Sequence, residues 1–234
     1  MPEGRPTRAK AERVRQLRVA QMRSDERTGQ LVAANEQLVL SILQAQVAFD
    51  AATLLIAQMR RMAERDVLTE LPNRMLMLDR FELSLALARR HDTKLAVLFV
   101  DLNNFKQIND QLGHAFGDQV LQLVAKCLAD AIRSSDTVSR HGGDEFLVLL
   151  SDVSSVQDAV ATAYKIVGAL EAPTCLGVHD IRLTASIGIS IFPDDADTVA
   201  TLIDHADDAM YNAKHLGPAS FVYHGDVLAE APPR

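Results

Sequence analysis

The segment Thr137-Val-Ser-Arg-His-Gly-Gly-Asp-Glu-Phe-Leu-Val-Leu-Leu150 decides the fold. Two short runs with strand character flank Gly142-Gly143, and a Gly-Gly pair at such a place is typical of a hairpin turn. The segment therefore predicts two strands joined by a tight turn that carries Asp144 and Glu145. A second apolar run, residues 95–100, has the length and β-branched content of a buried strand and ends at Asp101.

Helical patterns alternate with these strands along the chain. We predict a tight loop over residues 103–106 and a further strand over 181–192. Gly217-Pro218 ends the last predicted helix. Helices interleaved with strands predict an α+β (α/β-like) domain, a sheet covered by helices. The predicted helices span residues 75–90, 119–132, 157–171 and 199–216.

The first 65 residues have a different pattern, with no Pro after Pro6. One stripe of apolar residues follows an unbroken 4-3 spacing, which is typical of a helix that packs on a partner helix. A supercoiled dimer and a helix folded back on its own chain both fit. The stripe consists of Leu38, Ile42, Ala45, Phe49, Ala52, Ile56, Met59 and Ala63. We predict a basic flexible arm over 1–25, a coiled-coil helix over 26–65, the α+β domain over 66–224 and a flexible tail over 225–234.

Composition excludes several classes of function. The 234 residues carry a net charge of −7, although residues 1–23 hold seven Lys or Arg against two Asp or Glu. An acidic body with 5% aromatic residues argues against nucleic-acid binding. Cys127 and Cys175 form no metal-binding or redox pattern, so we expect free thiols. Without an 18-residue apolar run or a signal-type core, the sequence predicts a cytoplasmic chain with no membrane span.

Three carboxylates fall at the predicted strand ends. If the strands lie side by side, Asp101, Asp144 and Glu145 meet at one edge of the sheet. Mg²⁺ prefers oxygen ligands, and paired carboxylates on adjacent strands are suited to in-line attack on phosphorus. Gly142 and Gly143 lack Cβ atoms and let a ligand approach the backbone. Taken singly, each feature also fits a solvated strand end or a plain turn.

The segment after Asp101 has residues suited to a nucleotide. Backbone N–H groups in the loop Asn103-Asn104-Phe105-Lys106, with the adjacent Lys, suit a polyphosphate. Asn109 and Asp118 could read a purine edge, because a carboxylate accepts from the N1–H and N2–H₂ groups of guanine. Each residue alone fits a polar loop position or a helix cap equally well.

Together these motifs resemble the GGDEF-domain diguanylate cyclase family. The resemblance runs from about Asp66 to Gly217, and several motifs in the right order make it specific. The matching motifs are Asp66–Arg74, Phe99–Asp110, Gly113–Asp118, the signature loop Arg140–Phe146, Ser186–Ile189 and Ala206–Lys214. It implies a palm-like fold with a central, mainly antiparallel sheet wrapped by helices. It also implies condensation of two GTP into cyclic di-GMP with release of two pyrophosphates.

The resemblance also implies roles for single residues. Asp101, Asp144 and the Leu102 carbonyl would bind Mg²⁺ (or Mn²⁺). Glu145 would be a further metal ligand or help to deprotonate the attacking 3′-hydroxyl, and Arg140 would stabilise charge on the phosphoryl group. The implied substrate residues are Asn104, Phe105, Lys106 and Lys214 for phosphates, Asn109 and Asp118 for guanine, and Gly142 and Gly143 at the turn.

Arg133-Ser-Ser-Asp136 resembles the family's product-inhibition motif, where Arg forks onto phosphate or guanine. An exposed i,i+3 salt bridge is the other interpretation. Three residues depart from the family pattern. Glu70 replaces a usual Gly and predicts modest strain, Asn103 replaces a frequent Asp, and Pro218 stands where an Arg commonly reaches phosphate.

A two-fold symmetric product requires two GTP-loaded domains face to face. The N-terminal helix would supply this by holding a homodimer at high effective concentration. The rival hypotheses are a catalytically weak domain that binds GTP or cyclic di-GMP as a sensor, and a purely structural coiled-coil adaptor. The three acidic residues favour the enzyme over both.

Overall fold

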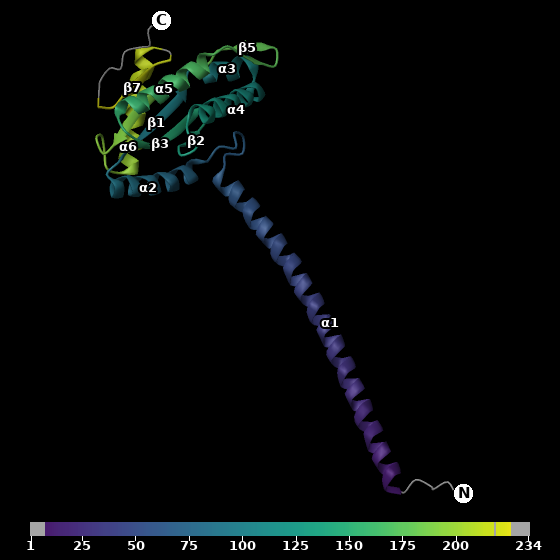
Figure 1. Cartoon of the computed structure of the whole chain (residues 1–234). Helices are drawn as coiled ribbons and strands as arrows, with labels where there is room; N and C mark the ends of the chain where they lie inside the picture. Colours follow the sequence, from purple (N-terminus) through teal and green to yellow (C-terminus); the bar gives the residue numbers. More distant parts are fainter. Residues whose placement is uncertain (1–7, 218, 226–234) are drawn as a thin grey trace. The chain divides into compact units, whose positions relative to one another are not determined.

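The structure is a computed structural model that describes residues 8–217 and 219–225. Its helices and strands are drawn in Figure 1. The chain divides into two compact units, Met1–Arg60 and Arg61–Arg234, and each is described by itself. Of the predicted tail over 225–234, only Gly225 belongs to the described residues.

The N-terminal unit is part of one unbroken helix, α1 (Arg8–Glu64). The sequence predicted a loose arm over residues 1–25, whereas the structure is helical from Arg8 onward. Residues 8–28 contain no Gly or Pro and are rich in Ala, Arg, Glu and Gln, which favour helix. Residues 1–7 lie outside the described part of the chain.

The apolar stripe of α1 is exposed in the single chain. Leu38, Phe49 and Ile56 are 58%, 68% and 65% exposed. Within Glu12–Glu64 an 18-residue window also reaches a mean hydropathy of 1.7, enough by length and composition to cross a membrane. The prediction of no membrane-spanning segment did not anticipate this, because it looked for an unbroken apolar run, whereas a stretch with a few polar residues can still be apolar on average. A single match of this kind is weak evidence for a span.

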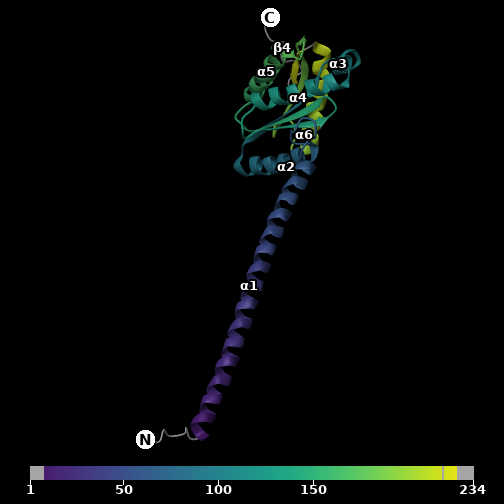
Figure 2. The ribbon, with the colours of Figure 1, turned by 90° about the vertical axis from the view of Figure 1, so that its right-hand side faces the viewer.

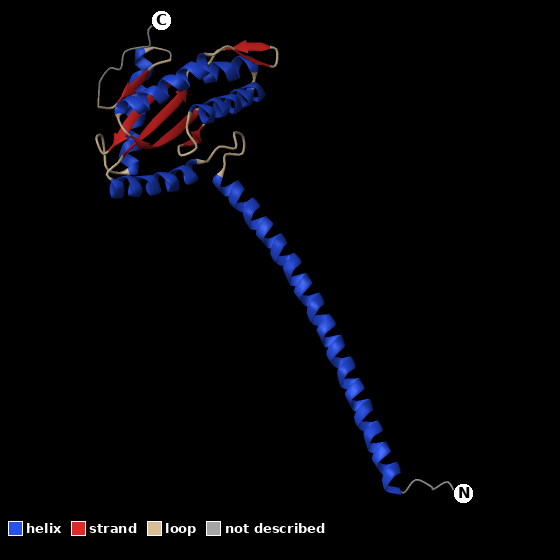
Figure 3. Cartoon of the chain, viewed as in Figure 1, coloured by secondary structure: helices blue, strands red, loops and turns tan. Residues whose placement is uncertain are grey.

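The second unit is built on a five-stranded sheet in the order β2-β3-β1-β6-β7. All neighbouring strands are antiparallel except the pair β6–β7, so the predicted mainly antiparallel sheet is confirmed (Figure 3). A separate two-stranded hairpin joins β4 and β5. The strands are β1 (Lys94–Leu102), β2 (Thr137–Gly142), β3 (Glu145–Val153), β4 (Thr174–Leu176), β5 (His179–Ile181), β6 (Ala185–Phe192) and β7 (Phe221–Tyr223).

Helices pack on both faces of this sheet, as Figures 1 and 2 show from two directions. The helices are α2 (Arg74–His91), α3 (Phe105–Leu112), α4 (His114–Ala131), α5 (Val156–Glu171) and α6 (Val199–Leu216). Side chains of a strand alternate between faces. Ala96, Leu98 and Val100 of β1 accordingly join the core with α4 and α5, whereas Leu95 and Val97 join the core with α2 and α6.

The structure refines three predicted elements. The predicted tight loop after β1 leads directly into α3 at Phe105. The predicted strand over 181–192 is interrupted, since β5 ends at Ile181 and β6 begins at Ala185. The last helix matches its predicted bounds, residues 199–216. β7 was not predicted, because three residues are too few to show a period.

Candidate active site

The structure brings the three predicted carboxylates together at one edge of the sheet. Asp101, near the end of β1, lies directly opposite Glu145 of β3 in the antiparallel register. Such partners point to the same face with Cβ atoms roughly 5 Å apart. Asp144 precedes Glu145, and its carbonyl accepts a hydrogen bond from the Leu102 N–H at 3.3 Å. The end of β1 is thereby tied to the turn of the hairpin.

The hairpin is as tight as the Gly-Gly pair predicts. Gly142 pairs with Glu145, which leaves Gly143 and Asp144 as a two-residue turn. Gly143 has a φ of 53°, a left-handed conformation that glycine adopts without strain. The register slips at His141, and bulges of this kind redirect neighbouring side chains. The local sequence therefore sets the direction of the acidic pair.

Burial and like charge raise the pKa values of two of these acids. Partial burial raises the pKa of Glu145 most, and the charges of Asp101, Asp207 and Asp144 raise it further. The pKa of Asp101 is also raised, first by burial, although Lys214 opposes the shift. Lys214 Nζ lies 3.0 Å from Asp101 Oδ2. The site therefore concentrates negative charge that a cation stabilises, and Lys214 supplies one positive charge.

The donor atoms fit a hard divalent ion. The three carboxylates and the Leu102 carbonyl offer only oxygen, which suits Mg²⁺ or Mn²⁺ better than zinc. Within residues 8–217 and 219–225, no group of three His, Cys, Asp or Glu side chains is arranged to hold a metal ion. A magnesium site would need only one or two of these carboxylates, with water and substrate phosphates in the other positions.

The predicted phosphate segment forms the start of α3. Asn104 has a φ of 60° and precedes the first helical residue, Phe105. The first N–H groups of a helix have no partner inside it and attract anions. Lys106 is exposed. Asn103, the departure from the family pattern, accepts a hydrogen bond from Ser186 Oγ at 2.9 Å through its side-chain oxygen.

The two predicted guanine-binding residues come from adjacent helices. Asn109 lies on α3, next to Gly117 of α4, and Asp118 directly follows Gly117 along the chain. A Cβ atom at Gly117 would lie 1.9 Å from Asn109 Oδ1 and 3.3 Å from the Phe105 ring. The Asn109 amide therefore occupies the space that a larger residue at position 117 would fill.

Arg140 contacts the protein rather than standing free. Its Nε and Nη2 donate to the Gly143 carbonyl at 2.9 and 2.8 Å. Its Nη1 contacts the Asp66 carboxylate at 3.2 and 3.3 Å. Its side chain is only 16% exposed. The predicted contact of Arg140 with a phosphoryl group therefore stays a prediction, and the geometry gives this side chain a role in the loop itself.

The predicted product site lies at the other end of the β2–β3 hairpin. Asp136 precedes β2, and its carboxylate accepts from the backbone N–H of Arg133 at 3.0 Å and of Ser151 at 3.2 Å. The ion pairs of the described residues include Lys94–Asp194, Arg140–Asp66 and Lys214–Asp101, and no ion pair involves Arg133 or Asp136. The surface salt bridge between Arg133 and Asp136 is therefore not formed. Arg133 is exposed.

One acidic residue near the site was missed by sequence reasoning. The charge of Asp207 on α6 raises the pKa values of both Asp101 and Glu145. Asp207 precedes Lys214 by seven residues, so both lie on the same side of the helix. That spacing was the available signal, because Lys214 was already assigned to the site.

These features define a class of protein: an antiparallel sheet that presents acidic residues and a Gly-Gly hairpin for phosphoryl chemistry. The chain matches the family described as "Diguanylate cyclase, GGDEF domain" over residues 63–219. It belongs to this family. The family assignment and the palm-like fold expected from the resemblance are both confirmed.

Individual relatives agree with the assignment. The chain is 44% identical over 159 residues to diguanylate cyclase TpbB of Pseudomonas aeruginosa, a match that covers 68% of this chain and 37% of TpbB. It is 39% identical over 194 residues to the bifunctional diguanylate cyclase/cyclic di-GMP phosphodiesterase MucR of the same species, covering 80% of this chain and 28% of MucR. The chain thus spans about a third of the length of these relatives.

Solved structures give the same fold. The isolated GGDEF domain of TpbB superimposes with a TM-score of 0.67 at 43% identity, covering 68% of this chain and 94% of that structure. The coiled coil and GGDEF domain of DgcB from Caulobacter crescentus, in complex with c-di-GMP, gives a TM-score of 0.68 at 25% identity. That match covers 77% of this chain and 98% of the DgcB chain.

Proposed function

We propose that this chain condenses two molecules of GTP into cyclic di-GMP and releases two pyrophosphates. The observation that carries the proposal is the register of β1 and β3, which places Asp101 opposite Glu145 and beside Asp144. Each 3′-oxygen forms a bond to the α-phosphorus of the other GTP, and the bond between the α- and β-phosphates breaks. Glu145, with its raised pKa, is suited to accept the proton of the 3′-hydroxyl.

Asp101, Asp144, Glu145 and the Leu102 carbonyl are the proposed ligands of Mg²⁺ or Mn²⁺. The ion would neutralise charge on the phosphates and polarise the α-phosphoryl group when bound. Lys214 is paired with Asp101 in this structure. We expect Lys214 to exchange that carboxylate for a phosphate oxygen when GTP binds, since both are anions within reach of one flexible ammonium group.

The proposed GTP-binding residues lie on α3, α4, α6 and the Gly-Gly hairpin. Phosphates would contact the backbone N–H groups at the start of α3 and the ammonium groups of Lys106 and Lys214. Guanine would contact Asn109 and Asp118, whose helices meet at Gly117. Gly142 and Gly143 leave room for the nucleotide, because nothing lies within 4 Å of a Cβ atom built at either position.

The product has two-fold symmetry, so the reaction needs two domains face to face. We propose that the exposed stripe of α1 pairs with the same stripe of a second copy in the cytoplasm and raises the local concentration of the domains. The unbroken 4-3 spacing supports a helical partner. Gln44, Gln46 and Asp50 lie inside the apolar region, where a bilayer would disfavour them.

Product inhibition is the finer part of the proposal. Arg133 is exposed and outside every ion pair of the described residues, which leaves its guanidinium available for a phosphate or guanine. Asp136 has a structural task in holding Ser151 and the loop before β2. Arg133→Ala is therefore the better test variant. It should relieve inhibition by added cyclic di-GMP without loss of stability, and an unchanged inhibition curve would contradict the assignment.

The central test incubates the purified chain with GTP and Mg²⁺, measures pyrophosphate release and identifies the nucleotide product. We expect cyclic di-GMP with two pyrophosphates per product, and no product from Asp144→Ala. GTP binding by the wild-type chain without turnover would replace the enzyme with the sensor hypothesis. Turnover by Asp144→Ala would show that the activity comes from a contaminant.

A further inference from the structure

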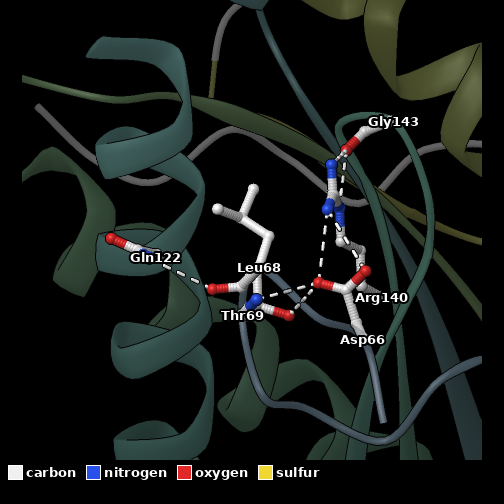
Figure 4. Close-up of polar contacts among 6 residues, drawn as sticks. All are labelled: Asp66, Leu68, Thr69, Gln122, Arg140 and Gly143. Atoms are coloured by element: carbon white, nitrogen blue, oxygen red, sulfur yellow. Dashed lines mark hydrogen bonds and ion pairs between the residues drawn. The ribbon is translucent and has the colours of Figure 1, made fainter. Parts of the chain in front are cut away.

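The turn between α1 and α2, residues 66–72 and here called the junction turn, contacts the signature loop directly (Figure 4). Its centre is the Asp66 carboxylate, which accepts from the Thr69 N–H at 2.9 Å and from Thr69 Oγ1 at 2.7 Å. The same carboxylate binds Arg140 Nη1 at 3.2 and 3.3 Å. One acid therefore closes its own turn and binds a residue 74 positions further along the chain.

Electrostatics favour the charged form of this acid. Burial on its own would raise the pKa of Asp66, but the hydrogen bonds from Thr69 and the positive charge of Arg140 outweigh it, and the pKa is lowered. The pair is three-quarters or more shielded from solvent, since the side chains of Arg140 and Asp66 are 16% and 24% exposed. A shielded charge-assisted hydrogen bond is stronger than an exposed surface pair.

The other side of Arg140 holds the catalytic hairpin. Two of its nitrogens, Nε and Nη2, converge on the carbonyl of Gly143, and its backbone N–H donates to the Pro72 carbonyl at 3.2 Å. Gly143 is the first residue of the two-residue turn that ends in Asp144. Glycine turns are conformationally free, so an external contact is needed to keep one geometry. Arg140 supplies it.

We propose that Asp66 is a positioning residue for the metal-binding hairpin: it holds the Arg140 guanidinium against the Gly143 carbonyl and so fixes the turn that carries Asp144 and Glu145. The inference rests on the proposed function and adds to it a residue that touches neither substrate nor metal. It also gives Arg140 a task in the loop that requires no contact with a phosphate.

The junction turn is itself held at fixed points. Asn73 donates from its side-chain amide to the Ala63 carbonyl at 2.7 Å and from its backbone to the Glu64 carbonyl at 2.9 Å. Its side-chain oxygen caps α2 by accepting from the Leu76 N–H. On the α4 side, Gln122 Nε2 donates to the Leu68 carbonyl at 3.1 Å. These hydrogen bonds fix the junction turn, so Asp66 holds Arg140 from a backbone segment that is itself held in place.

The test variant is Asp66→Asn in the full chain. The asparagine oxygen can still accept from Thr69 and from Arg140, but the negative charge and the second contact with Arg140, through Oδ2 at 3.3 Å, are lost. The turn is therefore kept, while the ion pair is replaced by one hydrogen bond to an uncharged acceptor. We expect kcat for cyclic di-GMP formation to fall about tenfold, equivalent to about 1.4 kcal/mol, with KM for GTP within about twofold of wild type. Hydrogen exchange of a peptide covering residues 139–146 should become faster.

The matched control is Thr69→Val, which removes one hydrogen bond from the same carboxylate and leaves Arg140 in place. It should keep wild-type kcat and hydrogen exchange in residues 139–146. Arg140→Gln should lower kcat at least as far as Asp66→Asn, and the double variant should be no worse than Arg140→Gln alone. Additive losses in the double variant would overturn the proposal, because Asp66 would then act by another route.

Two further results distinguish a failure of the positioning role of Asp66 from a failure of the proposed cyclase function. If the wild-type chain makes no cyclic di-GMP, the proposed function fails, and the exchange rates of residues 139–146 alone decide whether Asp66 fixes the hairpin. If wild type is active and Asp66→Asn keeps both its kcat and its exchange rates, the positioning role is wrong while the proposed function stands. A kcat loss that disappears at a lower assay temperature would indicate lost stability alone and would also reject it.

Discussion

The backbone at Glu70 has a φ of 58°, in the left-handed region that residues with a Cβ atom avoid. Its N–H donates to the Asp66 carbonyl, and its own carbonyl accepts from Arg65, so the junction turn holds this conformation. The strain expected from a Glu in place of Gly is present. We predict that Glu70→Gly stabilises the chain by about 0.5–1 kcal/mol, or about 1–3 °C in Tm by calorimetry.

The matched control for that prediction is the same substitution in a helix. Glu82 is an exposed residue of α2, and Glu82→Gly should destabilise the chain by about 1 kcal/mol. A lower Tm for Glu70→Gly would show that the glutamate side chain makes a contribution larger than the backbone strain.

Gly117 is a second residue whose lack of a Cβ atom has a functional consequence. In Gly117→Ala the methyl group would collide with Asn109 Oδ1 and displace the amide that we assign to guanine. Alanine also favours helix, so the fold should not suffer. We predict that KM for GTP rises about tenfold while Tm stays equal or rises. Gly168→Ala in α5, where a methyl group meets nothing within 4 Å, should raise Tm and leave KM unchanged.

The acidic cluster has an energetic cost that depends on pH. A carboxyl group whose pKa is raised in the folded state binds protons more tightly there, so its ionisation destabilises the fold as pH rises through the folded pKa. We predict that Glu145→Gln abolishes activity yet raises Tm by about 2 °C at pH 7, as is common at functional sites. The gain should shrink as pH falls toward 4.5, the ordinary pKa of this side chain. A gain that stays constant from pH 7 down to pH 4.5 would contradict this cause.

The single residues show where sequence reasoning reaches its limit. Asp101, Asp144 and Glu145 could be predicted because a strand ending and a Gly-Gly turn fix their places from local sequence alone. The contact between Asp66 and Arg140 could not, since it joins residues 74 positions apart through side-chain geometry. Asp207 entered the site for a similar reason, through the packing of α6 on the sheet.

Among the elements, α6 packs unusually close to the sheet. Gly188 of β6 faces it, and a Cβ atom there would lie 1.9 Å from the Ala206 carbonyl oxygen and 2.2 Å from the Met210 nitrogen. Both are backbone atoms of a helix and cannot move independently. The glycine therefore sets the distance at which α6 presents Lys214 to Asp101.

We predict that Gly188→Ala destabilises the chain by about 3 kcal/mol, the upper range of overpacking, because the whole helix must move. Urea unfolding measures the loss directly, with Gly168→Ala as the control for an unhindered Gly-to-Ala change. The helix must also move away from β1, so we expect weaker GTP binding. A loss below about 0.5 kcal/mol would mean that the sheet, rather than the helix, adjusts.

The bounds of the helices and strands show what the apolar periodicity of the sequence can predict and what it misses. The bounds of α6 agree with prediction because Thr198 caps its start and Gly217 ends it. The loop predicted over residues 103–106 overlaps the start of α3, and no helix was predicted over 105–112, since eight residues with a polar surface show little periodicity. Apart from α3, β4 and β7, the predicted order of helices and strands is found, because each of the longer buried strands has a clear apolar run.

At the scale of the whole molecule, the exposed apolar side chains of α1 need a partner that shields them from water. Apolar side chains occupy the stripe and also the opposite side of the helix, where Leu40, Val47 and Leu54 are 60%, 68% and 66% exposed. Over residues 38–56, apolar side chains therefore lie on two sides of the helix, with Gln44, Gln46 and Asp50 between them. The sequence predicted the stripe but gave no weight to the residues opposite it, which explains why the helix also matches a membrane span by composition.

Two double variants show whether the apolar surface of α1 is covered by a second copy of the chain or by a lipid bilayer. Ile42→Glu with Phe49→Glu places charges in the stripe, and Leu40→Glu with Val47→Glu places the same charges at the same spacing on the opposite side. If α1 pairs along the stripe, sedimentation equilibrium should show the stripe variant as a monomer and the control as a dimer. If α1 enters a bilayer instead, both variants should lose binding to phosphatidylcholine vesicles equally.

Catalysis should then depend on enzyme concentration in a way that only pairing explains. A dimer held by α1 keeps its two domains at an effective concentration of about millimolar, so specific activity should be independent of dilution. In the stripe variant the domains must meet by diffusion, and specific activity should rise in proportion to enzyme concentration in the micromolar range. Since each domain is intact, the variant should approach wild-type activity at high concentration. Equal specific activity of both double variants at every concentration would show that α1 does not bring the domains together.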